Sequence, residues 1–516
     1  MLEIINDEKK RILNNAAISI IQAILTSVSL FFLYRFLVNK IGIARLGIWS
    51  AVLATTSVAN MANFGISGSV VKFVAKYIAT GDQKKVVAVI ETAAVTIGIF
   101  IGFIAIIAFP FIGWIIKLVI PENSLTEALA IMPYSLASLW LVMVSGVFQA
   151  AHDGAQRYSI KSGIIICGNL FYLLVCFWLV PGHGLVGLAW SQAAQAFFVL
   201  CSSWLFLKFR VAGLSLIPFR WNKGVFREIV KYGINFQLIS ICQMLFDPAT
   251  KSLLVKFGGL SITGFYEMAN RMVLQVRSLI VSANQVLVPA IAGIYEKEPE
   301  KINNIYKTAS IILVFISAPL LFSLTALAPI ISIAWIGHYE KPFVFFSLLL
   351  SIGWFFNMLN VPAYFSNLGT GKLRGNLIGT VLIALLNPVL CFLFGSFYGG
   401  YGVAVGWMVS LVAGSLLIVV FYHKDNNISF KSVLTNDSLV IVLSAATASA
   451  ISLVFYISLS DYLNIRLVLS FTVILYFAVI AWSVWRHPVR KRLSGWGLGI
   501  VRGTWLGTTL HKFSQQ

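Results

Sequence analysis

The chain has 516 residues, of which 59% are hydrophobic and only 11% are charged. Soluble domains contain about 25% charged residues, so this composition excludes a soluble enzyme and also a disordered or fibrous protein. The charge is unbalanced, with 38 basic and 18 acidic side chains and a net charge of +20. In a membrane protein such an excess predicts basic cytoplasmic loops, and we expect no nucleic-acid partner.

Long apolar segments follow one another along the chain. A helix needs about 20 mostly apolar residues to cross the hydrocarbon core of a bilayer, and only helices or closed barrels satisfy the backbone there. The sequence therefore predicts an all-α polytopic membrane protein with about fourteen transmembrane helices. The predicted spans are residues 12–36, 46–68, 86–110, 127–151, 160–180, 185–207, 229–255, 262–290, 305–336, 343–367, 375–396, 402–422, 438–459 and 465–485.

The loops between these spans define the orientation. Most of the 38 basic residues fall in the loops that share a side with both termini, including residues 208–228 and the tail at 486–516. Because cytoplasmic loops carry the excess of Lys and Arg, both termini are predicted to be cytoplasmic.

Several glycines and an asparagine recur at an offset of 217 or 218 residues. The matching pairs are Gly42 with Gly259, Gly47 with Gly264, Asn169 with Asn387, and Gly184 with Gly402. A repeat of six spans predicts two pseudo-symmetric six-helix lobes around a central cavity, plus two extra C-terminal helices. We expect an N-terminal lobe at 1–209, a cytoplasmic linker at 210–228, a C-terminal lobe at 229–425, two additional spans at 438–485 and a basic cytoplasmic tail at 486–516.

Four predicted spans carry polar stripes that cannot face lipid. They form repeat-equivalent pairs, the first span with the seventh and the second with the eighth, so we expect all four to line the cavity. The polar residues predicted to line it are Gln22, Asn60, Asn63, Gln243, Gln275 and Asn284.

Charged side chains inside spans face a cavity or a partner and are functional candidates. The basic ones are Arg35, Lys251, Arg271 and Arg277, which we predict to form a cationic substrate site. Acids four residues away can neutralise Lys251 and Arg271, whereas Arg277 has no acid within one turn. An unpaired guanidinium can hold phosphate or carboxylate by two parallel hydrogen bonds. The alternative for Arg277 is pairing with another helix.

The acids in question are Asp247 and Glu267. Asp247 precedes Pro248, which frees a backbone carbonyl, so Asp247, with Glu267, is the candidate coupling-ion or proton site. A helix kink with a local ion pair is the alternative. No cofactor and no metal site are expected, because the histidines and cysteines lack metal-ligand spacing. No catalytic residue is predicted, so we do not expect an enzyme.

Short motifs in both predicted lobes carry a family resemblance. They are GIARLGIW at 42–49, NFGIS at 63–67 and VKFVA at 71–75, with GFY at 264–266 and ANR at 269–271 in the second lobe. Their order and spacing resemble the polysaccharide-transporter (oligosaccharide and O-antigen flippase) family of the multidrug/oligosaccharidyl-lipid/polysaccharide flippase superfamily.

The resemblance implies a function and a location. It implies a flippase that moves undecaprenyl-diphosphate-linked oligosaccharide across the cytoplasmic (inner) membrane of a bacterium by alternating access, coupled to an ion gradient. The product would serve O-antigen and lipopolysaccharide, capsule, exopolysaccharide or teichoic acid assembly. The implied partners are the lipid-linked oligosaccharide, membrane lipids, a polysaccharide polymerase and a chain-length regulator.

Three alternatives remain open at this point. A lipid II or other glycolipid flippase would share the fold. A multidrug/cation antiporter of the same superfamily would favour an acidic cavity, whereas the predicted cavity is basic. A membrane-embedded polymerase or ligase would need a large outer loop, and the longest predicted outer loop covers only residues 110–126.

Overall fold

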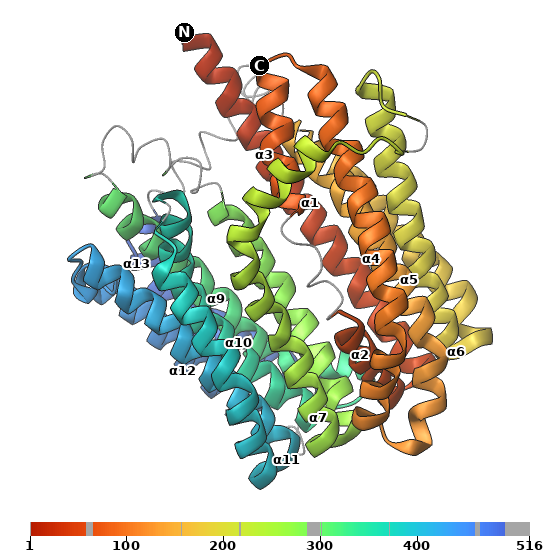
Figure 1. Cartoon of the computed structure of the whole chain (residues 1–516). Helices are drawn as coiled ribbons and strands as arrows, with labels where there is room; N and C mark the ends of the chain where they lie inside the picture. Colours follow the sequence, from red (N-terminus) through yellow and green to blue (C-terminus); the bar gives the residue numbers. More distant parts are fainter. Residues whose placement is uncertain are drawn as a thin grey trace, which may run out of the picture. The chain divides into compact units, whose positions relative to one another are not determined.

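The computed structural model describes residues 2–57, 66–155, 157–215, 218–285, 291, 300, 302–370, 372–459 and 465–490. Within these ranges, the side chains of residues 2–20, 23, 57, 79, 231–245, 282–285, 465 and 466 are not described. The regular elements of the described part are all helical (Figure 1). They are α1 (Leu2–Ile41), α2 (Ile43–Ser57), α3 (Ile66–Ala79), α4 (Gln83–Val119), α5 (Glu122–Gly154), α6 (Tyr158–Arg210), α7 (Lys223–Gln285), α9 (Ile302–Ile336), α10 (Lys341–Thr370), α11 (Arg374–Asp425), the 3-10 turn η3 (Phe430–Ser432), α12 (Asn436–Leu459) and α13 (Ile465–Arg486).

Three very long helices are each bent at a glycine. The backbone leaves the helical conformation at Gly184 in α6 (φ 55°), at Gly259 in α7 (φ 78°) and at Gly399 in α11 (φ 60°). Only glycine adopts such positive φ values at little cost. Each of these helices therefore accounts for two consecutive predicted spans. In α11 the bend lies three residues before Gly402, the residue that the repeat aligns with Gly184.

The helices have the length and polarity of membrane spans. In the described residues, nine helices are long and apolar enough to cross a membrane. Large apolar side chains on α4 are exposed, with Ile99 at 70%, Phe103 at 61% and Ile106 at 74%. So much exposed apolar surface is typical of contact with lipid. The expectation of an all-α polytopic membrane protein is confirmed. The predicted second span, 46–68, covers α2, the first residues of α3, and residues 58–65, which lie outside the description.

The chain divides into two compact units, and the boundaries between them fall within α1, α7 and α11. One unit comprises residues 21–268 and 380–410, and the other comprises residues 1–20, 269–379 and 411–516. In the first, α5 packs against α2, α3, α4 and α6. In the second, α9 packs against α10, α12 and α13, and α12 lies beside α13. The six-helix lobes stay a prediction.

The last two helices are bound to α9 by side-chain hydroxyl groups. Ser449 Oγ on α12 donates to the carbonyl oxygen of Phe322, and Tyr476 Oη on α13 donates to that of Pro319, both over 2.7 Å. Both hydroxyl-bearing residues are buried. The two extra helices are therefore joined to α9 within the second unit by specific polar contacts.

The segment that joins α6 to α7 is bound to α4. The backbone N–H of Ser215 donates to Glu91 Oε1 over 2.8 Å, and Trp221 Nε1 donates to Thr96 Oγ1 over 3.1 Å. Glu91 is fully buried. This acidic side chain therefore serves to fasten the linker.

Candidate functional site

Within the first unit, α2 crosses the second half of α7 at two glycines. A Cβ atom on Gly47 would collide with the carbonyl oxygen of Leu260, and a Cβ atom on Gly264 would collide with that of Ile43. The offset of 217 residues converts Ile43 and Gly47 into Leu260 and Gly264. The crossing is therefore symmetric with respect to the sequence repeat. Glycine is required at both positions because the backbones touch.

A buried network of charged groups lies one turn beyond this crossing. Ser50 Oγ donates to Glu267 Oε2 over 2.8 Å, and these two residues are also 217 positions apart. Lys251 Nζ lies 2.8 Å from the same oxygen and 2.9 Å from Asp247 Oδ2. The Lys251 and Glu267 side chains are 5% and 2% exposed, whereas that of Asp247 is 48% exposed.

In this geometry the charge of Lys251 is compensated by two carboxylates. The predicted pairing of Lys251 with Asp247 is confirmed, and Glu267 is a second carboxylate partner. A buried ammonium needs such partners, since an uncompensated charge costs several kcal/mol, on the order of 3–5. Asp247 is the most exposed member of the network.

Arg277, in the second unit, has a different environment. Its guanidinium carbon lies 4.2 Å from the ring centroid of Trp354, and its Nη2 makes a long hydrogen bond of 3.5 Å to Asn357 Oδ1. Its Nε is buried and has no hydrogen-bond partner among the described residues. No carboxylate of the described part forms an ion pair with it. The helix that Arg277 meets therefore offers neutral groups.

Trp354 and Asn357 were not among the predicted site residues. They lie three residues apart on α10 and so share one face of that helix. Asn357 Nδ2 in turn donates to Ser415 Oγ on α11 over 2.9 Å. An amide in the apolar span at 343–367 is the sequence signal that could have pointed to this contact.

The structure places the remaining predicted residues separately. Arg271 and Gln275 are half-buried on α7, Gln22 is half-buried on α1, and Arg35 is exposed there. The predicted residues whose side chains lie outside the description are Asn60, Asn63, Gln243 and Asn284. Their place in a common cavity stays a prediction.

Two repeat-equivalent asparagines form further polar links within the first unit. Asn169 Nδ2 on α6 donates to Thr26 Oγ1 on α1 over 2.9 Å. Asn387 Nδ2 on α11 donates to Thr250 Oγ1 on α7 over 3.0 Å. In both predicted lobes, an asparagine of the fifth span thus donates to a threonine of the first span.

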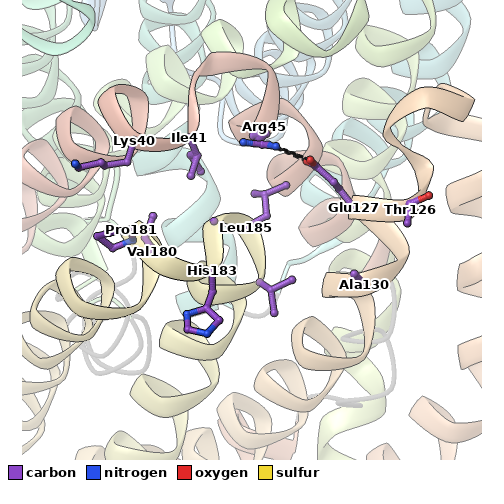
Figure 2. A pocket seen from close by; sticks show the side chains of 12 residues that line it. Lys40, Ile41, Arg45, Thr126, Glu127, Ala130, Val180, Pro181, His183 and Leu185 are labelled. Carbon is purple, nitrogen blue, oxygen red and sulfur yellow. Dashed lines mark hydrogen bonds and ion pairs between the residues drawn. The ribbon is translucent and has the colours of Figure 1, made fainter.

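The first unit also has a pocket of about 490 Å³ at the bend of α6. Its lining comes from the end of α1, the start of α2, α5 and the α6 bend (Figure 2). Arg45 points at Glu127 across this pocket and makes a two-pronged ion pair, with distances of 2.7 Å from Nη2 and 3.0 Å from Nε. None of the predicted site residues lines it. In the described part of the chain, no group of His, Cys, Asp and Glu could hold a metal ion.

Comparison with known proteins identifies a family and several structures with a similar fold. Residues 41–338 match the family described as "Polysaccharide biosynthesis protein". No curated protein matches the chain. The lipid II flippase MurJ, in an inward closed conformation, is similar in structure, with a TM-score of 0.69 at 13% identity over 91% of this chain and 97% of MurJ.

Two further solved structures are similar in fold. A multidrug resistance MATE family transporter of the MOP superfamily, in an inward-facing conformation, has a TM-score of 0.68 at 15% identity over 79% of this chain and 94% of its own. A MOP superfamily transporter from Pyrococcus furiosus, described as having a binding pocket of reverse polarity, has a TM-score of 0.58 at 15% identity over 80% of this chain and 96% of its own. The chain has the fold of MOP superfamily transporters, and it belongs to the polysaccharide biosynthesis protein family.

Proposed function

We propose that the protein is a flippase that moves a lipid-linked oligosaccharide, carried on undecaprenyl diphosphate, across the cytoplasmic membrane of a bacterium. The family match and the shared fold of a lipid flippase support this class of function. The observation that carries the choice of an anionic lipid is Arg277, a cation whose described neighbours, Trp354 and Asn357, are neutral.

The physical reasoning starts from the substrate. A diphosphate with polar sugars cannot enter the hydrocarbon core without replacing its hydration, since buried charges need partners. A guanidinium binds phosphate by two parallel hydrogen bonds and stays charged at any physiological pH. Arg277 offers such a group in the predicted eighth span, and the polyprenyl tail would remain in lipid.

Movement of the substrate would follow from alternating access, in which one lobe rocks against the other. In this proposal the protein is a transporter and not an enzyme, both termini are cytoplasmic, and Asp247 couples the cycle to an ion gradient. The oligosaccharide would be destined for O-antigen and lipopolysaccharide, capsule, exopolysaccharide or teichoic acid, with a polymerase and a chain-length regulator as partners downstream.

A second candidate is a lipid II or other glycolipid flippase. The structural match to the lipid II flippase covers 91% of this chain, compared with 79% for the multidrug transporter. Both lipids carry a diphosphate, so Arg277 would serve either one. A multidrug/cation antiporter is less consistent with Arg277, because a guanidinium that has no acidic partner in the described part of the chain would repel cationic drugs.

The test is a flipping assay in proteoliposomes with undecaprenyl-diphosphate oligosaccharide, lipid II and a cationic drug as separate substrates. We expect transport of the oligosaccharide lipid, and loss of transport in Arg277→Ala. Arg486→Ala is the matched control, because Arg486 also lies over a tryptophan, Trp482, at 4.7 Å, but at the end of α13. Transport of lipid II alone would favour the second candidate, and transport of the drug alone would refute both.

A further inference from the structure

The guanidinium of Arg277 lies over the indole of Trp354, 4.2 Å from the ring centroid. A cation above an aromatic ring is attracted by the negative face of the ring. The ring carries no formal charge and no carbonyl or carboxylate oxygen, so this contact neither cancels the charge of the guanidinium nor supplies an acceptor for its N–H donors. A carboxylate partner would instead occupy those donors and cancel the charge. Trp354 therefore stabilises the cation without neutralising it.

A chain of hydrogen bonds fixes Arg277 from a second side. Asn357 Oδ1 faces Arg277 Nη2 at 3.5 Å, while Asn357 Nδ2 donates to Ser415 Oγ at 2.9 Å. Ser415 is fully buried. Because the amide nitrogen is directed at Ser415, the amide oxygen is the end that faces the guanidinium. The amide thus accepts from Arg277 without adding a negative charge.

One buried donor of Arg277 indicates a ligand. Its Nε is buried and lacks a hydrogen-bond partner in the part of the chain that the structure describes. A buried donor without an acceptor is unfavourable. An oxygen from a bound anion would satisfy it, whereas a cationic or apolar substrate would leave it unsatisfied.

We infer that Trp354, Asn357 and Ser415 are positioning residues that hold Arg277 with its Nε–H directed at a phosphate oxygen of a diphosphate lipid. This inference rests on the proposed function and names the residues that make Arg277 selective for an anion. The selectivity has a simple cause. The partners are a π face and an amide, so the charge of the guanidinium is left for the substrate.

The sharpest test is Asn357→Asp, which places a carboxylate at the same distance from Arg277 with almost no change in shape. The probe is radiolabelled farnesyl diphosphate, a short polyprenyl diphosphate, bound at equilibrium to the full-length protein in detergent. We expect binding to weaken by about tenfold to a hundredfold, the range for loss of a charge-assisted hydrogen bond. Thermal stability should be kept or raised, because the substitution adds an ion pair.

Variants of Trp354 test the cation–π contact with Arg277. Trp354→Leu should weaken binding by about threefold to thirtyfold, the range for a cation–π contact, and Trp354→Phe should recover part of that loss. Trp482→Leu is the matched control, since it removes the ring beneath Arg486 at the end of α13 and should leave binding unchanged.

The outcomes separate the two claims. If the unmodified protein neither binds the probe nor flips the oligosaccharide lipid, the proposed function is wrong. If the unmodified protein binds the probe and Asn357→Asp or Trp354→Leu binds it equally well, the positioning role is wrong while the function stands. A loss of binding in Asn357→Asp with unchanged stability supports the inference, because a purely structural amide would not produce it.

Discussion

A methyl group added at Gly47 tests the symmetric crossing of α2 and α7. In Gly47→Ala the new Cβ atom would lie far inside contact distance of the carbonyl oxygen and carbon of Leu260. These are backbone atoms, so the clash cannot be relieved by rotating a side chain. One helix has to move, and overpacking of this kind costs about 1–3 kcal/mol.

Alanine also has an intrinsic advantage in a helix, which has to be subtracted. Replacing a mid-helix glycine by alanine stabilises by about 0.5–1 kcal/mol where there is room. Gly163 on α6 is such a position, because a Cβ atom there meets nothing within 4 Å. Gly163→Ala is therefore the matched control for the propensity effect. The net expectation for Gly47→Ala is a loss of stability of up to about 2.5 kcal/mol, and in every case a lower stability than that of Gly163→Ala.

The assay is thermal unfolding of the purified protein in detergent, with both variants beside the unmodified protein. We expect Gly47→Ala to unfold at a lower temperature and Gly163→Ala at the same or a higher one. Gly264→Ala should behave like Gly47→Ala, because the repeat gives it the equivalent contact with Ile43. If Gly47→Ala unfolds at or above the temperature of Gly163→Ala, the close backbone contact is refuted.

Three further predictions concern charged groups. Lys251→Met should lower the stability by about 3–5 kcal/mol, because it leaves a buried Glu267 without its ammonium, and combining it with Glu267→Gln should recover part of the loss in the same unfolding assay. Arg277→Ala should abolish complementation of a polysaccharide-export mutant, and full activity of this variant would refute the anion site. Arg277→Lys should restore only part of the activity, because an ammonium cannot bind phosphate through a planar pair of donors. Asp247→Asn should uncouple flipping from imposed pH or Na⁺ gradients in proteoliposomes, and unchanged coupling would place the coupling site elsewhere.

Local contacts were predictable from the chain because a helix brings together residues at fixed spacing. The pairing of Lys251 with Asp247 follows from their separation of one turn. Gly259, where α7 bends, aligns with Gly42 in the sequence repeat, and the two glycines have similar positive φ values of 78° and 81°. In each case the information lies within a few residues, or in a repeat that the sequence displays openly.

Contacts between distant helices could not be predicted in the same way. Arg277 was identified as a candidate because no acid lies within one turn of it on its own helix. Its neighbours Trp354 and Asn357 lie about 80 residues further along the chain, on α10. Ser50 and Glu267 meet across 217 residues. Helical periodicity indicates which face of a helix is polar, but not which helix that face meets.

The class of this protein follows from its composition, because the thickness of a bilayer and the cost of burying polar groups in it leave few alternatives for so apolar a chain. The repeat, and the identity of the charged residues that lie within apolar spans, can also be read from the order of the residues alone. Which of those charges have a carboxylate partner follows from the folded arrangement of the helices. Lys251 is held by two carboxylates, whereas Arg277 lies against an indole and an amide. That difference arises from helix packing, which sets the partner of each buried charge and hence whether the charge is available to a ligand.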